Sequence, residues 1–166
     1  MYDQAIAYLM QSDAFRELYK KLQNSPEKIM ITFVSDMDDW FWTNSQYCGI
    51  DWDPTSGLLL GDGTSVQSAA LGLVHEMGHA ARHIDGKFES ADEEQREIDT
   101  VTMYETPIAK QLGEPTRRFT KDYIRSYRMS NPTHFRTTSL QVTYVPSSHY
   151  TVEKTVPIVR NHNGIW

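Results

Sequence analysis

The sequence predicts a mixed α+β fold, and three features lead to this expectation. Apolar residues at helical spacing open the chain, short β-rich runs bounded by turn residues follow, and two further helical patterns come next. A helix, a small sheet and then two helices in this order are typical of the α+β class. Because the chain has 166 residues, we expect residues 1–166 to form one domain.

The first elements are predicted from spacing and turn chemistry. Residues 5–22 (AIAYLMQSDAFRELYKKL) carry apolar side chains near helical spacing, and a Ser-Pro pair ends the pattern. Strands are predicted at 28–34 (KIMITFV) and 46–53 (QYCGIDWD), with a third short strand at 58–60 (LLL). A Gly-Asp-Gly run then breaks the last of these strands.

Two helices are predicted after the strands. The first carries the segment LGLVHEMGHAARHIDG, and we expect Thr64 or Ser65 to cap its start and Gly86 to end it. The second runs from about 91 to 112 and opens with acidic residues, which suit the helix dipole. Pro107 lies inside this second helix, so we expect a kink or an early stop just before it.

The pattern weakens after Thr120. Residues 121–129 (KDYIRSYRM) favour a helix, and 140–159 alternate in the manner of a loose hairpin. The last residues, RNHNGIW, are interpreted as a tail.

Composition narrows the possible functions. The net charge is −6 and no Lys/Arg run stands out, which disfavours a nucleic-acid partner. No apolar run reaches the roughly 20 residues of a membrane span, and the N-terminus does not read as a signal peptide. Cys48 is the single cysteine, so an internal disulfide and a multi-cysteine zinc knot are excluded.

The segment His75-Glu76-Met77-Gly78-His79 predicts a metal site. Residues four apart on a helix share one face, so both imidazoles can reach one ion. A catalytic zinc ion takes three protein ligands and one water, and Glu76 is placed to act as the base toward that water. The flanking residues are apolar and indicate a buried helix, where unsatisfied histidines would be costly. We expect one zinc ion per chain, because no second ligand cluster is visible in the sequence.

Four residues compete for the third ligand position. His83 lies about 6 Å further along the helix than His79, too far to converge easily on the same ion, so we interpret it as an outer or surface residue. Asp85 matches the third position of a longer motif that requires a glycine where this chain has an arginine. We favour Glu97 on the second helix, with Glu105 as the alternative ligand or as an anchor for one of the histidines.

Three segments resemble a known family. They are AIAYLMQSDAFRELYKKL, IDWDPTSGLLLGDGTSVQSAALGLVHEMGHA and REIDTVTMYETPIAKQLGEPTRRF. Together they are similar to the zinc metallopeptidase toxin domains at the carboxy-terminal tips of bacterial VgrG and Rhs proteins, and more distantly to NleD-like effector peptidases. The resemblance covers about residues 5–120.

The resemblance implies a zincin-like metallopeptidase of the gluzincin kind. His75 and His79 match the zinc ligands, Glu76 matches the base, and Glu97 matches the glutamate ligand of the following helix. The chain departs from the best-known gluzincins at Val101, where they place an aspartate, so the resemblance assigns no outer partner to His75.

Substrate binding is also an expectation from this fold. The strand before the motif helix, GLLLG, would be the sheet edge that pairs with an extended peptide. A side chain must also stabilise the oxyanion. The candidates are Tyr104, Tyr123, Tyr127, His134, His149 and Tyr150.

The leading hypothesis is a zinc endopeptidase that acts as a delivered bacterial toxin or effector, in a type VI secretion or polymorphic-toxin context. It implies a protein or peptide substrate, a larger secreted or fused VgrG/Rhs-type carrier with this domain at its C-terminal end, and a cognate immunity protein. The site of action would be the periplasm of a competing bacterium or a host cell. The alternative is a binding module in which zinc only staples two helices and the domain docks on a partner.

Overall fold

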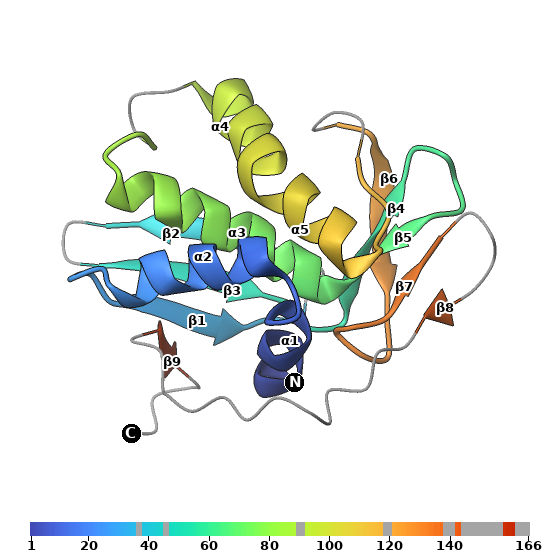
Figure 1. The fold of residues 1–166 in the computed structure, drawn as a ribbon, viewed down its shortest axis with the longest axis horizontal. Coiled ribbons are helices and arrows are strands. Elements are labelled where there is room, and N and C mark those ends of the chain that lie inside the picture. Colours follow the sequence, from blue (N-terminus) through green and yellow to red (C-terminus); the bar gives the residue numbers. More distant parts are fainter. Residues whose placement is uncertain are drawn as a thin grey trace.

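Helices and two small sheets make up the computed structural model, which describes residues 1–35, 38–44, 47–88, 92–117, 121–137, 142–143 and 158–161 (Figure 1). The elements, in chain order, are α1 (Tyr2–Leu9), α2 (Asp13–Gln23), β1 (Ile29–Phe33), β2 (Trp40–Thr43), β3 (Cys48–Trp52), β4 (Ser56–Leu60), β5 (Val66–Gln67), α3 (Ala69–Ile84), α4 (Glu93–Thr100), a π-helical segment η1 (Val101–Glu105), α5 (Thr106–Leu112), β6 (Tyr123–Arg128), β7 (Phe135–Arg136), β8 (Val142–Thr143) and β9 (Ile158–Asn161). The predicted α+β class is confirmed.

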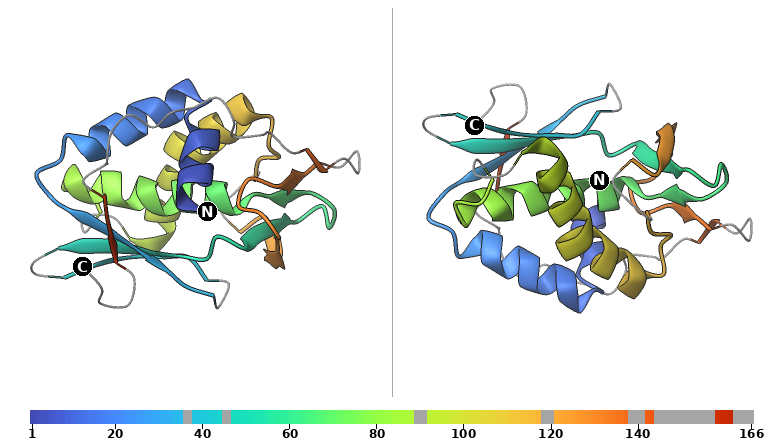
Figure 2. Two further views of the ribbon diagram at one scale, coloured as in Figure 1. Left: turned by 90° about the horizontal axis from the view of Figure 1, so that it is seen from below. Right: turned by 90° about the horizontal axis from the view of Figure 1, so that it is seen from above.

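The strands form two sheets where the sequence suggested one. The first has the order β2-β3-β1-β9, in which β1 runs parallel to β3 and β9, and β2 is an antiparallel strand at the edge. The second has the order β6-β4-β5-β7-β8 and is antiparallel throughout. The helices gather on one side of the first sheet, with α3 next to the strands (Figure 2).

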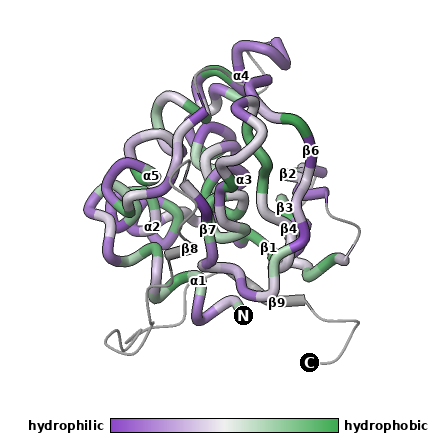
Figure 3. Tube along the Cα trace, turned by 90° about the vertical axis from the view of Figure 1, so that its right-hand side faces the viewer, coloured by the Kyte–Doolittle hydropathy of each residue, from purple (hydrophilic) through white to green (hydrophobic). Residues whose placement is uncertain are grey.

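Helix α3 lies at the centre of the core. It packs against β2, β3 and β4 on one side and against α2 on the other. Trp52 on β3 is fully buried, and its indole N–H donates to the Ala69 carbonyl in the first turn of α3 at 2.8 Å. By contrast α4 is drawn mostly as hydrophilic in Figure 3, because only one side of it faces the protein. The buried position of α3 is what the apolar flanks of the motif predicted.

Two predicted helix boundaries are wrong. The first helix is interrupted at Ser12, whose hydroxyl accepts the Phe15 N–H at 3.1 Å and so starts α2 as a separate helix. The motif helix is capped by Ser68 instead of Thr64 or Ser65. The reason is that residues 66–67 pair with β4 as β5, which delays the start of the helix. Its predicted end holds, because Gly86 adopts a left-handed conformation with φ of +67°.

The prediction for 121–129 is also wrong, because this stretch forms strand β6. Residues 123–128 pair antiparallel with β4, an interaction with a strand far away in the sequence that outweighs the local helical pattern. The hairpin predicted at 140–159 lies mostly outside the described residues. Its described parts do not pair with each other, since β8 joins β7 and β9 joins β1.

Candidate metal centre

The two motif histidines lie on one face of α3 and point into the same space. The ligand atoms of His75, Glu76 and His79 all lie within 4.8 Å of one another, so this group can hold a metal ion. All three residues belong to the part of α3 that the surrounding elements cover, and the side chains of His75 and His79 are only 11% and 7% exposed. Burying three polar groups in this way is unfavourable unless they have partners.

Glu97 on α4 is the partner that both histidines share. Its Oε2 lies 3.0 Å from His75 Nε2, and its Oε1 lies 3.0 Å from His79 Nε2. In a tetrahedral zinc shell with bonds near 2.0–2.1 Å, neighbouring N and O ligands are separated by roughly 3.3 Å. The two N···O distances are therefore within a few tenths of an ångström of the separation in such a shell, and two imidazoles with a carboxylate are a donor set that zinc accepts.

A π-helical segment brings a second glutamate, Glu105, to the same imidazole as Glu97. In a regular α-helix, residues eight apart are offset by roughly 80° around the axis. One residue inserted by π-type bonding reduces this offset to roughly 20°. The Thr106 N–H donates to the Val101 carbonyl five residues back, which is the π pattern. Pro107 follows directly and has no N–H to continue the regular ladder. The disturbance predicted near Pro107 is therefore the feature that aligns the two carboxylates.

Gly78 allows this helix to approach α3 closely. A Cβ at position 78 would lie 2.8 Å from Thr100 Cγ2 and 2.9 Å from Tyr104 Cδ2, closer than carbon atoms pack. The close approach of the two helices thus explains why position 78 is a glycine. It lets the backbone of α4 and η1 come near enough for Glu97 to reach the two histidines.

Each histidine has a second partner on its other ring nitrogen. His75 Nδ1 lies 3.0 Å from Glu105 Oε2, and His79 Nδ1 lies 3.1 Å from Thr100 Oγ1. Such contacts fix the orientation of metal-binding imidazoles. Glu105 thus occupies the position of an anchor for His75, which is the role that the sequence left open as an alternative to direct metal binding.

Glu105 is itself held in a buried charged network. The Arg117 guanidinium contacts both of its carboxylate oxygens, and the Gln67 amide donates to Oε1 at 3.0 Å. Burial alone would raise the pKa of Glu105, but Arg117 and His75 outweigh it and lower the pKa to about 2. Burial likewise opposes the charged form of His75, yet the neighbouring carboxylates raise its pKa to about 10. Arg117 therefore keeps the Glu105 carboxylate ionised in the core.

Glu76 has a different environment from the other carboxylates. It is 7% exposed, and it accepts the backbone N–H of Phe41 on the edge strand β2. Burial raises its pKa, which the charges of His75 and His79 oppose. A buried carboxylate with a raised pKa beside two potential metal ligands has the properties of a general base.

The site opens into a cavity of about 910 Å³. It is bordered by β2, β4, α3, α4 and β6, and both histidines, Glu76 and Glu97 line it. This volume lies in the range of typical ligand-binding cavities.

The candidate oxyanion donors differ in whether they line the cavity. Tyr123 on β6 lines the cavity. Tyr104 packs near Gly78, and Tyr127 lies under the Arg136 guanidinium, 5.2 Å from ring centre to Cζ. His149 and Tyr150 lie outside the described residues, and His134 is not among the residues that line this cavity.

The prediction that GLLLG forms a sheet edge is wrong. Strand β4 contains the first four residues of this segment and is paired on both sides, with β5 and with β6. The strand at the edge of the other sheet is β2, which borders the cavity and carries Phe41. Sequence patterns did not indicate β2, because its four residues, WFWT, follow a turn-like acidic run and are too few to show a period.

His83 and Asp85 are directed elsewhere. His83 Nε2 pairs with Glu27 Oε2 at 3.2 Å, and Asp85 Oδ2 pairs with Lys21 Nζ at 2.5 Å. Sequence reasoning also missed Thr100, Arg117 and Gln67. The only signal was that all three lie in the segments that carry the family resemblance.

Comparison with protein families, with curated proteins and with solved structures finds no match to this chain. Among the helices in the described part of the chain, none has the length and apolar character needed to cross a membrane.

Proposed function

We propose that the chain is a zincin-like zinc endopeptidase in which His75, His79 and Glu97 bind one zinc ion. The observation that carries this proposal is the position of Glu97, whose two oxygens lie 3.0 Å from the Nε2 atoms of the two histidines. Glu76 stands beside this group in the same cavity, where a structural zinc site would have no use for it. Glu105 and Thr100 orient the two imidazoles from behind.

The chemistry follows from these positions. Zinc in such a site polarises a water molecule and a peptide carbonyl. Glu76 takes a proton from the water and transfers it to the departing amine, and its burial keeps it close to the reacting groups. Tyr123, which also lines the cavity, is the donor we assign to the oxyanion.

A peptide substrate would bind along β2. This strand pairs with β3 and stands at the edge of its sheet. The Phe41 N–H points to Glu76 and not to β3, so the free side of β2 adjoins the proposed base. Trp40, which lines the cavity and is 65% exposed, offers an apolar surface to a substrate side chain. An extended peptide added to this edge would therefore cross the proposed zinc position.

The biological role we propose is that of a delivered bacterial toxin or effector. The support is the resemblance of residues 5–120 to the toxin domains of VgrG and Rhs proteins. Delivery would depend on a carrier or secretion machine. The producing cell would need an immunity protein, which would bind in the cavity and block the site.

The decisive test is Glu76→Gln. The purified chain, loaded with zinc, is incubated with separate periplasmic and cytoplasmic protein extracts, and new N-termini are identified by labelling and mass spectrometry. We expect the variant to keep zinc and helical circular dichroism but to lose cleavage by about 10²–10⁴-fold. Glu94→Gln is the matched control, because Glu94 also borders the cavity but is exposed. Equal cleavage by the Glu76→Gln variant and the parent would overturn the peptidase proposal.

A second experiment separates the two functional hypotheses. The parent and the Glu76→Gln variant are expressed in the cytoplasm and, with an added leader, in the periplasm of a test bacterium. If the chain is a peptidase, the parent is toxic and the Glu76→Gln variant is not. The compartment in which the parent is toxic then contains the substrate. If both proteins impair growth equally, the zinc-stapled binding module explains the effect instead.

A further inference from the structure

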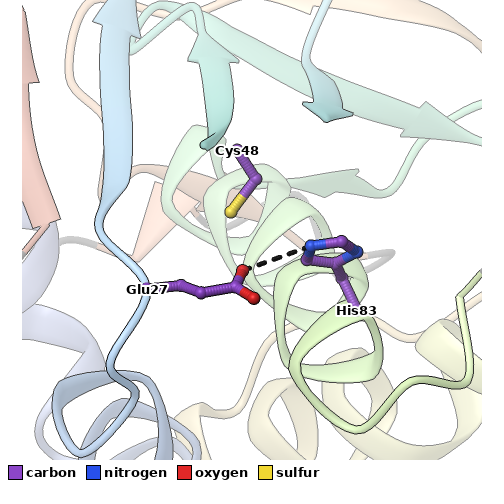
Figure 4. Close-up of side chains that lie close together, drawn as sticks. All are labelled: Glu27, Cys48 and His83. Atoms are coloured by element: carbon purple, nitrogen blue, oxygen red, sulfur yellow. Dashed lines mark ion pairs between the residues drawn. The ribbon is translucent and has the colours of Figure 1, made fainter. Parts of the chain in front are cut away.

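A second group of potential metal ligands lies at the other end of α3. Glu27, Cys48 and His83 each offer one ligand atom, and these oxygen, sulfur and nitrogen atoms all lie within 4.8 Å of one another. Figure 4 shows the three side chains directed toward a common point, with the ion pair between His83 Nε2 and Glu27 Oε2 at 3.2 Å. They come from three separate parts of the chain, namely the segment before β1, the first residue of β3 and the last turn of α3.

Aromatic side chains separate this group from the first site. The Phe41 ring lies 6.3 Å from the His79 ring and 5.9 Å from the His83 ring, measured between centroids. Phe88 likewise contacts both imidazoles, at 5.7 Å and 6.4 Å. His83 is therefore held away from His79, although both lie on the same helix one turn apart.

A nucleophilic role for Cys48 does not fit its surroundings. The residue is fully buried, and burial together with the nearby Glu27 charge raises the pKa of its thiol to about 11. Reactive cysteines have the opposite properties, with a lowered pKa and access to solvent. A bound cation would reverse this preference, because coordination removes the thiol proton.

We propose that Glu27, Cys48 and His83 form a second metal site that binds a divalent ion of the zinc class. Thiolate, imidazole and carboxylate are ligands that zinc combines in proteins, and the soft sulfur disfavours calcium or magnesium. A tetrahedral shell separates such ligand atoms by roughly 3.3–3.6 Å. The His83 and Glu27 atoms lie 3.2 Å apart, and all three ligand atoms lie within 4.8 Å of one another. The fourth position belongs to water on the side of Glu27, whose side chain is 48% exposed.

This ion would act as a staple. It would connect the segment before β1 and the start of β3 to the end of the helix that carries the first site, and metal affinity would add to folding stability. The chain would then bind two ions, against the single ion expected from the sequence. The inference does not depend on peptidase activity, because none of its three ligands belongs to the first site.

Cobalt titration tests the proposal. Co²⁺ bound to a thiolate gives an intense ligand-to-metal charge-transfer band in the near ultraviolet, and Cys48 is the only cysteine, so the band reports this site alone. We expect the band to saturate at one Co²⁺ per chain when the metal-free full chain is titrated, in addition to Co²⁺ bound elsewhere. Zn²⁺ should displace it. Absence of the band from the folded parent would overturn the proposal.

Variants establish which residues are ligands. Cys48→Ser should abolish the band, and His83→Gln should weaken Co²⁺ binding, as followed by the band, by more than about 100-fold, beyond the range of an outer partner. Glu27→Gln should weaken it by at least about tenfold. Because Glu27 is half exposed, this variant is expected to fold. Glu17→Gln, an exposed change on α2, is the control. A band unaffected by both His83→Gln and Glu27→Gln would mean that Cys48 binds cobalt alone, which also overturns the site.

Discussion

The middle and the last turn of α3 present histidine in different settings. At His75 and His79, the imidazoles have carboxylate or hydroxyl partners on both ring nitrogens and face a large cavity. At His83, one glutamate and one buried thiol approach the ring, and no catalytic carboxylate corresponding to Glu76 is among the three grouped ligands. The surroundings of His75 and His79, the first setting, fix the orientation of both rings and leave room for a substrate. The surroundings of His83, the second setting, only bring ligands together. This difference separates a site suited to reaction from one suited to holding the fold.

The sharpest test of the first setting compares its two helix-borne carboxylates. Glu97→Ala should lower zinc affinity by well over 100-fold, because Glu97 meets the Nε2 atoms of both histidines. Glu105→Ala should lower it by about 10–100-fold, the range expected for a group that orients a ligand from outside. Zinc dissociation constants measured at one pH decide, since protons compete for the ligands.

A larger loss of zinc affinity for Glu105→Ala than for Glu97→Ala would exchange the roles of ligand and positioning residue. If Glu105→Ala lost zinc while Glu97→Ala kept it, Glu105 would be the third ligand and the peptidase proposal would survive with that change. Arg117→Gln serves as a further check, because it removes the main partner of Glu105 and a contact to His75 Nδ1 while leaving Glu97 in place. Its zinc affinity should be close to that of Glu105→Ala, the variant for which we expect the smaller loss.

Local spacing explains how much of the site the sequence could predict. His75 and His79 were visible because one helical turn joins them, and Glu97 because it lies at helical spacing from apolar residues on the next helix. The role of Glu105 could not be fixed, since its direction depends on the π segment, which sequence spacing does not reveal. Strand β2 was missed because its four residues are too few to show a period, and β6 was assigned to a helix because its partner β4 lies far away in the sequence. The Glu27–Cys48–His83 group was invisible for the same reason.

The start of α3 is a third setting, where a carboxylate is buried without imidazole. Glu114 accepts hydrogen bonds from Tyr8 and from both the N–H and the hydroxyl of Ser68, which caps α3. Burial nevertheless raises the pKa of Glu114 from 4.5 to about 7. The carboxyl group of Glu114 therefore binds its proton more tightly in the folded state than in the unfolded state. Its contribution to stability is present below pH 4.5 and is lost as the pH rises to about 7.

We therefore expect Glu114→Gln to flatten the pH dependence of stability between about pH 4.5 and 7. The group contributes about 3 kcal/mol at most, which follows from the difference between the two pKa values. The free energy of unfolding in urea, measured with chelator present at several pH values, gives the slopes of the parent and the variant. Equal slopes for the two proteins would show that Glu114 does not hold a proton in this range.

Gly78→Ala tests the close approach of the helices at the first setting. The new methyl group would clash with Thr100 and Tyr104. We therefore expect the free energy of unfolding to fall by about 1–2 kcal/mol, after allowing for the better helix propensity of alanine. Zinc affinity should fall as well, because α4 carries Glu97. Thr100→Ser removes the Thr100 methyl but keeps the hydroxyl near His79. The double variant should recover part of the loss in a double-mutant cycle, and a fully additive result would contradict the proposed contact.

The smallest effect is expected at Asp85, which the longer sequence motif offers as a third ligand. Its carboxylate contacts Lys21 on α2, at the far side of His83 from the first site, and both side chains are about one-third exposed. Exposed ion pairs contribute little, so Asp85→Ala should reduce stability by less than about 1 kcal/mol. Zinc affinity at the first site should stay within about twofold, since Asp85 takes no part in orienting His75 or His79. Isothermal titration of the parent and the variant measures this directly. A large loss of zinc on Asp85→Ala would mean that the end of α3 unwinds toward His79 when metal binds, and the separation of the two settings along this helix would no longer hold.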